Sequence, residues 1–190
     1  MTTNSHRLAL PPIETEPGVL VHPCSDRRLA AEHWLLSTSR NRDRTRAEWR
    51  RHGIAMLHLG ALFSAVRLPE PLVLALVDKP WDPALVDPLL KDMLDGPVIC
   101  DPRHHRYYAL VPASVPVTWR QAVEEWREVD VDCLGRGSIL GVPRLDADRY
   151  DGQASYWSVP MQSAGVLCAP LHVARMIAAA RHLLHEEPDA

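Results

Sequence analysis

The stretch Gly-Arg-Gly-Ser at residues 135–138 brings together backbone N–H groups, an arginine and a hydroxyl. These groups have the chemistry of an anion-binding nest, in which Arg136 and Ser138 would contact a phosphate. The same residue types also build tight hairpins that bind no ligand. Both interpretations are open at this point.

Six arginines crowd one polar stretch, at positions 40, 42, 44, 46, 50 and 51. Such a patch can follow a nucleic-acid backbone, and a tryptophan within it can stack on a base. The residues expected to make this contact are Arg44, Arg46, Trp49 and Arg50. The alternative is a solvated face, because Asp43 and Glu48 dilute the positive charge.

The charge of the whole chain limits what it attracts. With histidine neutral the formal net charge is −3, from 21 basic and 24 acidic residues among 190. A chain with this charge is not drawn as a whole to a phosphate backbone. Any affinity for nucleic acid must therefore come from a local patch.

The four cysteines, Cys24, Cys100, Cys133 and Cys168, are widely scattered and form no C-x-x-C pair. Because the N-terminus carries no secretory signal, we expect reduced thiols in a cytoplasmic protein. No apolar run approaches the roughly 18 residues of a membrane span, so we expect no membrane partner.

The elements that position these residues are short and mixed in type. We expect residues 1–24 to form an N-terminal arm and residues 25–190 a single domain, since a chain of 190 residues has little room for a second core. Four helices are expected. The first starts at Ser25, and the second runs from Asp82 to Leu94 with a kink or split at Pro88. The third starts at a capping box formed by Thr118 and Gln121, and the last starts at Pro170. Strands are expected at 54–59 paired with 62–68, at 98–100 paired with 106–111, and at 129–134, 139–143 and 156–159. This mixture without strict alternation predicts an α+β fold, a mainly antiparallel sheet backed by helices.

From Trp49 to Pro160 a series of landmarks follows in a recognisable order. The stretches are Trp49, GIAMLHLG (53–60), FSAVRLPE (63–70), HHRYYALVP (104–112), VDCLGRGSILGVP (131–143) and DGQASYWSVP (151–160). In their order and spacing, over roughly three-fifths of the chain, they resemble the bifunctional primase–polymerase domain of the archaeo-eukaryotic primase superfamily. The resemblance implies a primase–polymerase-like fold with an RRM-like core.

The departures from the family carry the functional argument. In the family, one strand holds an Asp-x-Asp pair before a proline, and this pair binds the divalent metals of polymerisation. The matching positions here are Ser64 and Val66, or Arg67 if the register slips by one, and none ligates Mg²⁺ as a carboxylate does. The resemblance therefore implies that catalysis has been lost. Arg67 would place positive charge where the metals of the family sit.

Two landmarks of the family remain. His105 stands two residues before Tyr107, where the family places a nucleotide-contacting histidine, and Asp132 stands where it places a later acidic residue. The implied nucleotide-binding residues are His105, Arg67, Arg136 and Ser138. We expect either no cofactor or a Mg²⁺ held weakly by Asp132 and a bound nucleotide. Without a ligand, His105 would sit on a hairpin surface and Asp132 would partner Arg136.

Together these features favour a non-catalytic module in DNA-associated processes. It would bind a nucleotide or a nucleic acid, or act as a regulatory module. Two alternatives stay open. An active nucleotidyltransferase would recruit carboxylates from elsewhere, such as Asp101, Asp130 or Asp146. A protein-interaction module would have lost the cleft entirely.

Overall fold

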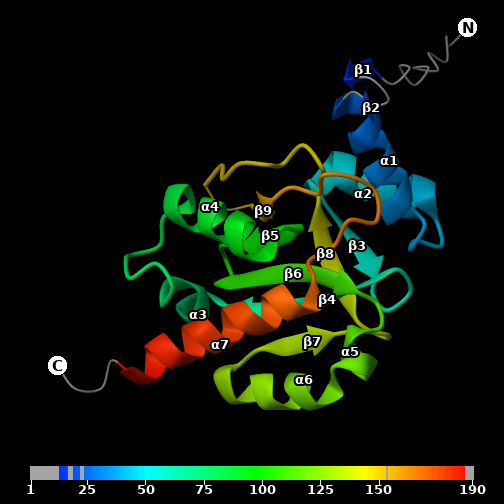
Figure 1. Ribbon diagram of the computed structural model, residues 1–190. Helices are drawn as coiled ribbons and strands as arrows, with labels where there is room; N and C mark the ends of the chain where they lie inside the picture. The colour runs from blue at the N-terminus through cyan, green and yellow to red at the C-terminus, as the bar shows by residue number, and fades with distance from the viewer. Residues whose placement is uncertain (1–12, 17–18, 22–23, 153, 187–190) are drawn as a thin grey trace, which may run out of the picture.

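The computed structural model describes residues 13–16, 19–21, 24–152 and 154–186. The protein is a mixed α+β structure in which a five-stranded antiparallel sheet and a two-stranded ribbon are backed by helices (Figure 1). The expected fold class is confirmed. Within the described ranges, no helix has both the length and the apolar character that crossing a membrane requires.

The five-stranded sheet is the centre of the fold. Its strands lie in the order β7 (Asp132–Leu134), β4 (Phe63–Pro69), β6 (Arg106–Pro112), β5 (Val98–Asp101) and β9 (Tyr156–Val159). All neighbours are antiparallel. β5 and β6 form the expected hairpin, with Asp101 opposite Arg106.

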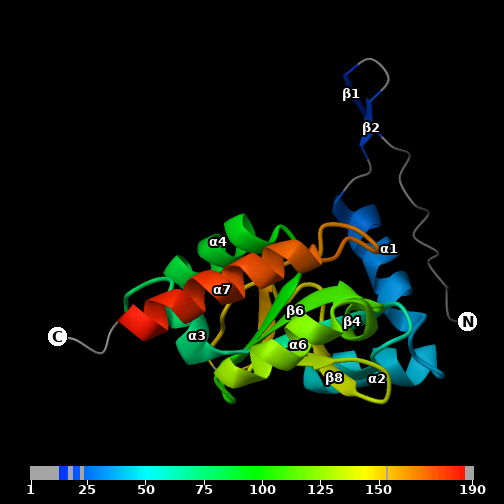
Figure 2. The same cartoon turned by 60° about the horizontal axis from the view of Figure 1, so that its bottom comes forward.

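Helices cover one face of this sheet. Alternate residues of a strand point to opposite faces, and Val66 and Leu68 of β4 are fully buried on the helical side. The helices that contribute to this cluster are α3 (Glu70–Leu74), α4 (Pro83–Leu94), α5 (Val115–Thr118), α6 (Arg120–Trp126) and α7 (Pro170–Glu186). Figure 2 shows α7 lying across the sheet, with α4 and α6 on its two sides.

The opposite face packs against a two-stranded ribbon and two helices. Phe63 and Ala65 of β4 belong to this second apolar cluster. The helices and strands that contribute from outside the five-stranded sheet are α1 (Cys24–Leu36), α2 (Arg42–His52), β3 (Ile54–His58) and β8 (Ile139–Pro143). In β3, Ala55 and Leu57 are buried whereas Met56 is exposed, as expected for a strand with one face on the core. β4 is therefore buried from both sides.

The pairing of β3 differs from the expected one. β3 pairs with β8, from Ile54 opposite Pro143 to His58 opposite Ile139, and not with β4. The reason lies in the turn after β3, where Gly60 has a φ of +84° and the chain passes into the other sheet. β7 and β8 also pair with different strands, so the turn at 135–138 between them joins the two sheets.

The helix starts agree with expectation except at one place. α1, α4 and α7 begin at Cys24, Pro83 and Pro170. α4 runs without interruption through Pro88, so the helix is not split there. The capping box at Thr118 is also wrong, because Thr118 ends the short helix α5 (Val115–Thr118) and its Oγ1 donates to the carbonyl of Ser114. Pro116, a residue favoured in a first helical turn, explains this earlier start.

Two further segments differ from expectation in detail. β1 (Ile13–Glu16) and β2 (Val19–Val21) form a two-stranded sheet within the segment expected to be an arm. The 3-10 helix η1 (Arg127–Val129) occupies the start of the strand expected at 129–134, so β7 begins only at Asp132.

The arginine-rich stretch forms α2. Asn41 caps its start by accepting a hydrogen bond from the N–H of Arg44 at 3.0 Å, and Gly53 ends it with a φ of +71°. Thr45 and Trp49, one turn apart, are its buried residues. The arginines of the stretch therefore occupy the remaining faces of the helix.

We predict that Gly60→Ala destabilises the fold far more than Gly137→Ala. Both glycines have a positive φ, +84° and +90°, which an alanine tolerates poorly. A Cβ at Gly60 would also lie 2.4 Å from the backbone nitrogen of Arg136, whereas nothing lies within 4 Å of one at Gly137. In urea unfolding we expect a loss of about 2–4 kcal/mol for Gly60→Ala and about 1 kcal/mol for Gly137→Ala. Equal losses would contradict the close packing of the two turns.

Candidate functional site

Asp132 lies in a row of polar side chains across three strands. Arg67 of β4 is directly opposite Asp132 of β7 on one side and Tyr108 of β6 on the other. Nη2 of Arg67 donates to Oδ2 of Asp132, and Nε of Arg127 lies 4.0 Å from Oδ1. The side chains of Arg67 and Asp132 are 31% and 35% exposed. The carboxylate is thus held by one guanidinium and approached by a second.

The strand geometry decides which β4 residues face Asp132. Ala65 and Arg67 are opposite Leu134 and Asp132 and share their face of the sheet. Ser64 and Val66 point to the helical face, where both are fully buried, and Ser64 Oγ donates to the carbonyl of Ala113 at 3.3 Å. Carboxylates at positions 64 and 66 would therefore point away from Asp132. Of the two registers expected from the sequence, only the one that includes Arg67 places a β4 position on the same face as Asp132.

Arg67 is committed to this pair. One of its terminal nitrogens donates to Asp132, and its Nε is buried without a hydrogen-bond partner among the described residues. The expected roles of Arg67 in phosphate binding and of Asp132 in metal binding thus compete with the contact between the two side chains.

The remaining candidate carboxylates are also paired with basic groups. Asp101 lies 2.8 Å from Nδ1 of His104, Asp130 accepts from Arg106 at 2.8 Å, and Asp146 accepts from Arg144 at 2.9 Å. Across the described part of the chain, no three His, Cys, Asp or Glu side chains are grouped so that they could hold a metal ion.

Three of the four cysteines are buried or half-buried and are not placed for nucleophilic chemistry. Burial raises the pKa of Cys100 and Cys168 to about 12 and that of Cys133 to about 11. These thiols stay protonated at neutral pH, and the thiolate is the reactive form. Burial also raises the pKa of the Asp87 carboxyl, which accepts hydrogen bonds from Tyr156 and Ser158 and so ties α4 to β9.

His105 and the 135–138 turn lie at opposite ends of β4. His105 is at the tip of the β5–β6 hairpin, and its carbonyl accepts from the N–H of Glu70, just after β4 ends. Gly135 lies beside Ser64 near the start of β4. The seven residues of β4, at roughly 3.3 Å each, separate these ends by about 20 Å. The structure therefore does not bring His105 and the turn into one cleft.

The turn itself is built as a tight connection. The N–H of Ser138 donates to the carbonyl of Gly135 at 3.0 Å, and the carbonyl of Ser138 accepts from Leu59. The side chain of Arg136 is exposed. The two backbone polar groups of Ser138 are thus used within the protein, whereas its hydroxyl and the side chain of Arg136 hydrogen-bond to no other described group.

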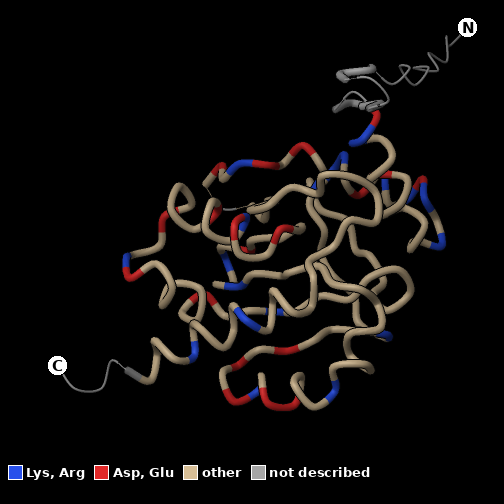
Figure 3. Tube along the Cα trace, viewed as in Figure 1, with Lys and Arg blue, Asp and Glu red and all other residues tan. Residues whose placement is uncertain are grey.

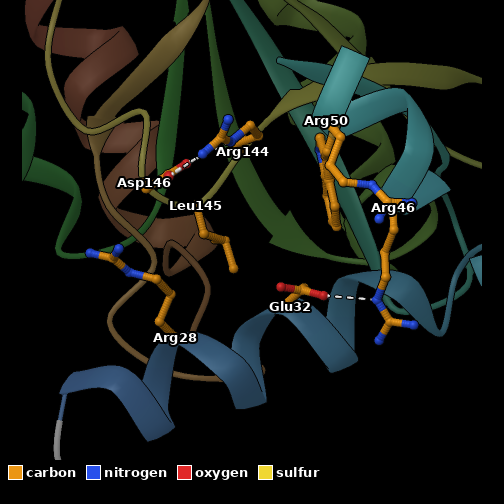
Figure 4. A pocket seen from close by; sticks show the side chains of 8 residues that line it. Arg28, Glu32, Arg46, Arg50, Arg144, Leu145 and Asp146 are labelled. Atoms are coloured by element: carbon orange, nitrogen blue, oxygen red, sulfur yellow. Dashed lines mark hydrogen bonds and ion pairs between the residues drawn. The ribbon is translucent and has the colours of Figure 1, made fainter. Parts of the chain in front are cut away.

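A different set of arginines does converge. A pocket of about 380 Å³ is lined from α1 by Arg28 and Glu32, from α2 by Arg46, Trp49 and Arg50, and from the segment after β8 by Arg144, Leu145 and Asp146. We call this the basic pocket. Figure 4 shows its side chains reaching in from the three segments.

Two of the four arginines are held by carboxylates. Nε of Arg46 donates to Glu32 at 3.0 Å, and Arg144 donates from two nitrogens to Asp146 (Figure 4). The hydrogen bond from Arg144 lowers the pKa of Asp146, so this carboxylate is charged at neutral pH. Four arginines and two carboxylates leave the pocket with a formal charge of +2.

The other two arginines, Arg28 and Arg50, are exposed and hydrogen-bond to no described side chain. Arg28 is close enough to Asp146 to contribute to its lowered pKa. Guanidinium groups with unused donors beside a concave surface suit a phosphate or a carboxylate ligand.

The structure divides the four α2 residues that were expected to bind nucleic acid. Arg46 and Arg50 line the basic pocket, whereas Arg44 does not and instead pairs with Glu48 at 3.1 Å. Trp49 is only 6% exposed, and its Nε1 donates to the carbonyl of Val142 at 2.9 Å. The expected stacking of a base on Trp49 is wrong, because the indole belongs to the core.

Arg28 and Arg144 were missed because they lie outside the arginine-rich stretch, in α1 and in the segment after β8. No local pattern links them to the arginine-rich stretch, and only the packing of α1 and of the segment after β8 brings them to it. Over α1 and α2, acidic residues also interleave with the basic ones (Figure 3), so charge alone did not mark the site.

Comparisons with known proteins add no assignment: no family model, no curated protein and no solved structure matches this chain.

We predict that Asp132→Asn lowers the free energy of unfolding by about 1–2 kcal/mol, because it leaves a partly buried guanidinium without its counter-charge. The double variant Arg67→Met with Asp132→Leu should recover most of this loss, since apolar groups can replace such a pair. Urea unfolding of the single and double variants measures the coupling. Glu124→Gln, which breaks the exposed pair with Arg120, is the control and should cost less than about 0.5 kcal/mol. A double variant as unstable as the sum of its single variants would contradict the pairing.

Proposed function

We propose that this chain is a non-catalytic primase–polymerase-like domain that binds the phosphates of a nucleic acid, as a binding or regulatory module in DNA-associated processes. One observation carries the proposal. Four arginines from α1, α2 and the segment after β8 converge on the basic pocket, and two of them have donors to spare. Convergence from three segments distinguishes this surface from a solvated charge run.

The basic pocket has the chemistry of a phosphate site. Arg28 and Arg50 would donate to phosphate oxygens, and an arginine can do so through two parallel N–H groups. Glu32 and Asp146 hold Arg46 and Arg144 in place and reduce the total charge. This balance predicts weak, salt-sensitive binding rather than a tight complex.

The spacing of the other candidate groups favours an extended strand over a single nucleotide as the ligand. His105 and Arg136 lie about 20 Å apart along β4 by the rise of a strand. If both contact the ligand, they contact different nucleotides. Nucleic-acid strands and free nucleotides both present phosphates. Competition by tripolyphosphate and by nucleoside triphosphates in each binding titration distinguishes these two sources of phosphate.

Arg67, the side chain opposite Asp132, supports the proposal that the domain is non-catalytic. Two-metal phosphoryl transfer needs several carboxylates to neutralise the attacking and leaving oxygens. Arg67 puts a cation at the position facing Asp132, and the two side chains bind each other. A Mg²⁺ at Asp132 would have to displace this contact.

The proposal places the protein in the cytoplasm. Cys100, Cys133 and Cys168 are free thiols, as expected of a chain in a reducing compartment.

We predict that Arg28→Gln with Arg50→Gln weakens binding of a fluorescein-labelled single-stranded oligonucleotide at least roughly tenfold, because charge-assisted hydrogen bonds are lost. Fluorescence anisotropy at 50 mM salt measures the affinity. Arg42→Gln with Arg44→Gln is the matched control, since it also removes two positive charges, both from α2 and outside the basic pocket, and it should change the affinity less than about twofold. Equal effects of the two changes would refute the pocket as the site.

We predict that removing a carboxylate of the basic pocket increases the affinity for the oligonucleotide. Asp146→Asn and Glu32→Gln each release an arginine and remove a negative charge, so each should tighten oligonucleotide binding about two- to fivefold. The same anisotropy titration detects the change. Weaker binding by both variants would show that the ligand is not an anion held in this pocket.

A further inference from the structure

A second pocket, of about 460 Å³, lies at the tip of the β5–β6 hairpin. Its lining comes from Glu70 at the start of α3, Trp81 before α4, Pro102, Arg103 and His105 of the hairpin, and Tyr150 and Gly152 after β8. We call this the aromatic pocket. His105 thus belongs to a concave site, although not to one with the 135–138 turn.

Two aromatic rings form a corner of this pocket. The ring centroids of Trp81 and Tyr150 are 5.0 Å apart, and the planes meet at 82°. Nε1 of Trp81 donates to the hydroxyl of Tyr107 at 2.8 Å, and Tyr150 also packs on Tyr156 with centroids 5.9 Å apart. Contacts with Tyr107 and Tyr156 therefore fix the positions of the Trp81 and Tyr150 rings. Tyr150 is still 38% exposed, so a planar group can stack on one ring and touch the other with its edge.

A carboxylate and an imidazole form the polar side of the pocket. Nδ1 of His105 lies 3.1 Å from Oε1 of Glu70. No described group hydrogen-bonds to the second oxygen of Glu70. His105 has a φ of +52°, and its carbonyl accepts from the N–H of Glu70 at 3.0 Å.

The segment after β8 connects the two pockets. A third pocket, of about 400 Å³, shares Arg144 and Asp146 with the basic pocket and reaches Asp151, next to Tyr150 of the aromatic pocket. Arg144 and Arg149 line this third pocket together with Asp146, Asp148 and Asp151, so a strand that runs from the basic pocket to the aromatic pocket would meet charges of both signs there.

From this geometry we infer that the aromatic pocket holds a nucleobase of the bound strand, stacked on Tyr150 and Trp81 and hydrogen-bonded to Glu70. The inference rests on the proposed function for its ligand class. Stacking on aromatic side chains with hydrogen bonds to an exposed base edge is how single strands are read. A carboxylate accepts N–H groups, and guanine presents two adjacent ones, so guanine is the preferred base.

An organic cation is the competing ligand, because aromatic faces beside a carboxylate also attract ammonium groups. Arg103 lines the same pocket and repels a cation, whereas it would favour the phosphate attached to a base. The observations therefore favour the nucleobase.

The test uses guanosine, which carries no phosphate, so that binding does not depend on the basic pocket. Titration of the full chain is followed by calorimetry and by the indole N–H signals in NMR, where Trp81→Phe identifies the Trp81 signal. Guanosine should shift this signal, and Tyr150→Leu should weaken binding roughly 5- to 150-fold, the range for loss of one stacking contact. Glu70→Gln should weaken guanosine more than adenosine. Thermal unfolding of each variant checks the fold.

Arg50→Gln is the matched control and should leave guanosine binding unchanged while weakening the oligonucleotide. If guanosine causes no shift, or if Tyr150→Leu and Glu70→Gln bind it like the wild type, the inference is wrong even when the oligonucleotide still depends on Arg50. A shift caused by tetramethylammonium and not by guanosine would identify a cation site instead. If Arg50→Gln does not weaken oligonucleotide binding while guanosine still binds, the proposed function is wrong and the inference about the aromatic pocket stands.

Discussion

Strand β4 is packed on both faces, and the rest of the molecule is arranged around this constraint. Its even-numbered residues from Ser64 to Leu68 lie under the helices, and its odd-numbered residues lie towards the β3–β8 ribbon and α1 and α2. A shift of one residue would exchange the two sets and bury Arg67 under the helices. The register of β4, and with it the position of Arg67 opposite Asp132, is therefore specified by two cores at once.

This register explains why the polar residues of the sheet do not form a metal centre. The only residue of β4 that directly faces Asp132 is a cation, and the two side chains neutralise each other. An arginine at this position supplies no metal ligand and gives Asp132 a counter-charge. Two arginines with unused donors, Arg28 and Arg50, lie instead beside the ribbon, where α1, α2 and the segment after β8 meet.

The sequence predicted the features that are local. The fold class, most strands and the starts of α1, α4 and α7 follow from short-range periodicity and from proline and cap positions. It did not predict that β3 pairs with β8, because a turn with Gly60 in the left-handed region reads like an ordinary hairpin. Nor did it predict the basic pocket or the burial of Trp49, since Arg28, Arg144 and Val142 lie outside the arginine-rich stretch and meet it only through packing.

The central claim, that phosphates bind in the basic pocket, is tested most directly by the salt dependence of oligonucleotide affinity. Each phosphate contact to a single strand contributes a slope of about −0.7 in a plot of log K against log salt concentration. With two to four arginines engaged, we predict a wild-type slope of roughly −1.4 to −2.8, reduced by about 1.4 in Arg28→Gln with Arg50→Gln. A slope near zero in the wild type, or one unchanged in the double variant, would contradict the account.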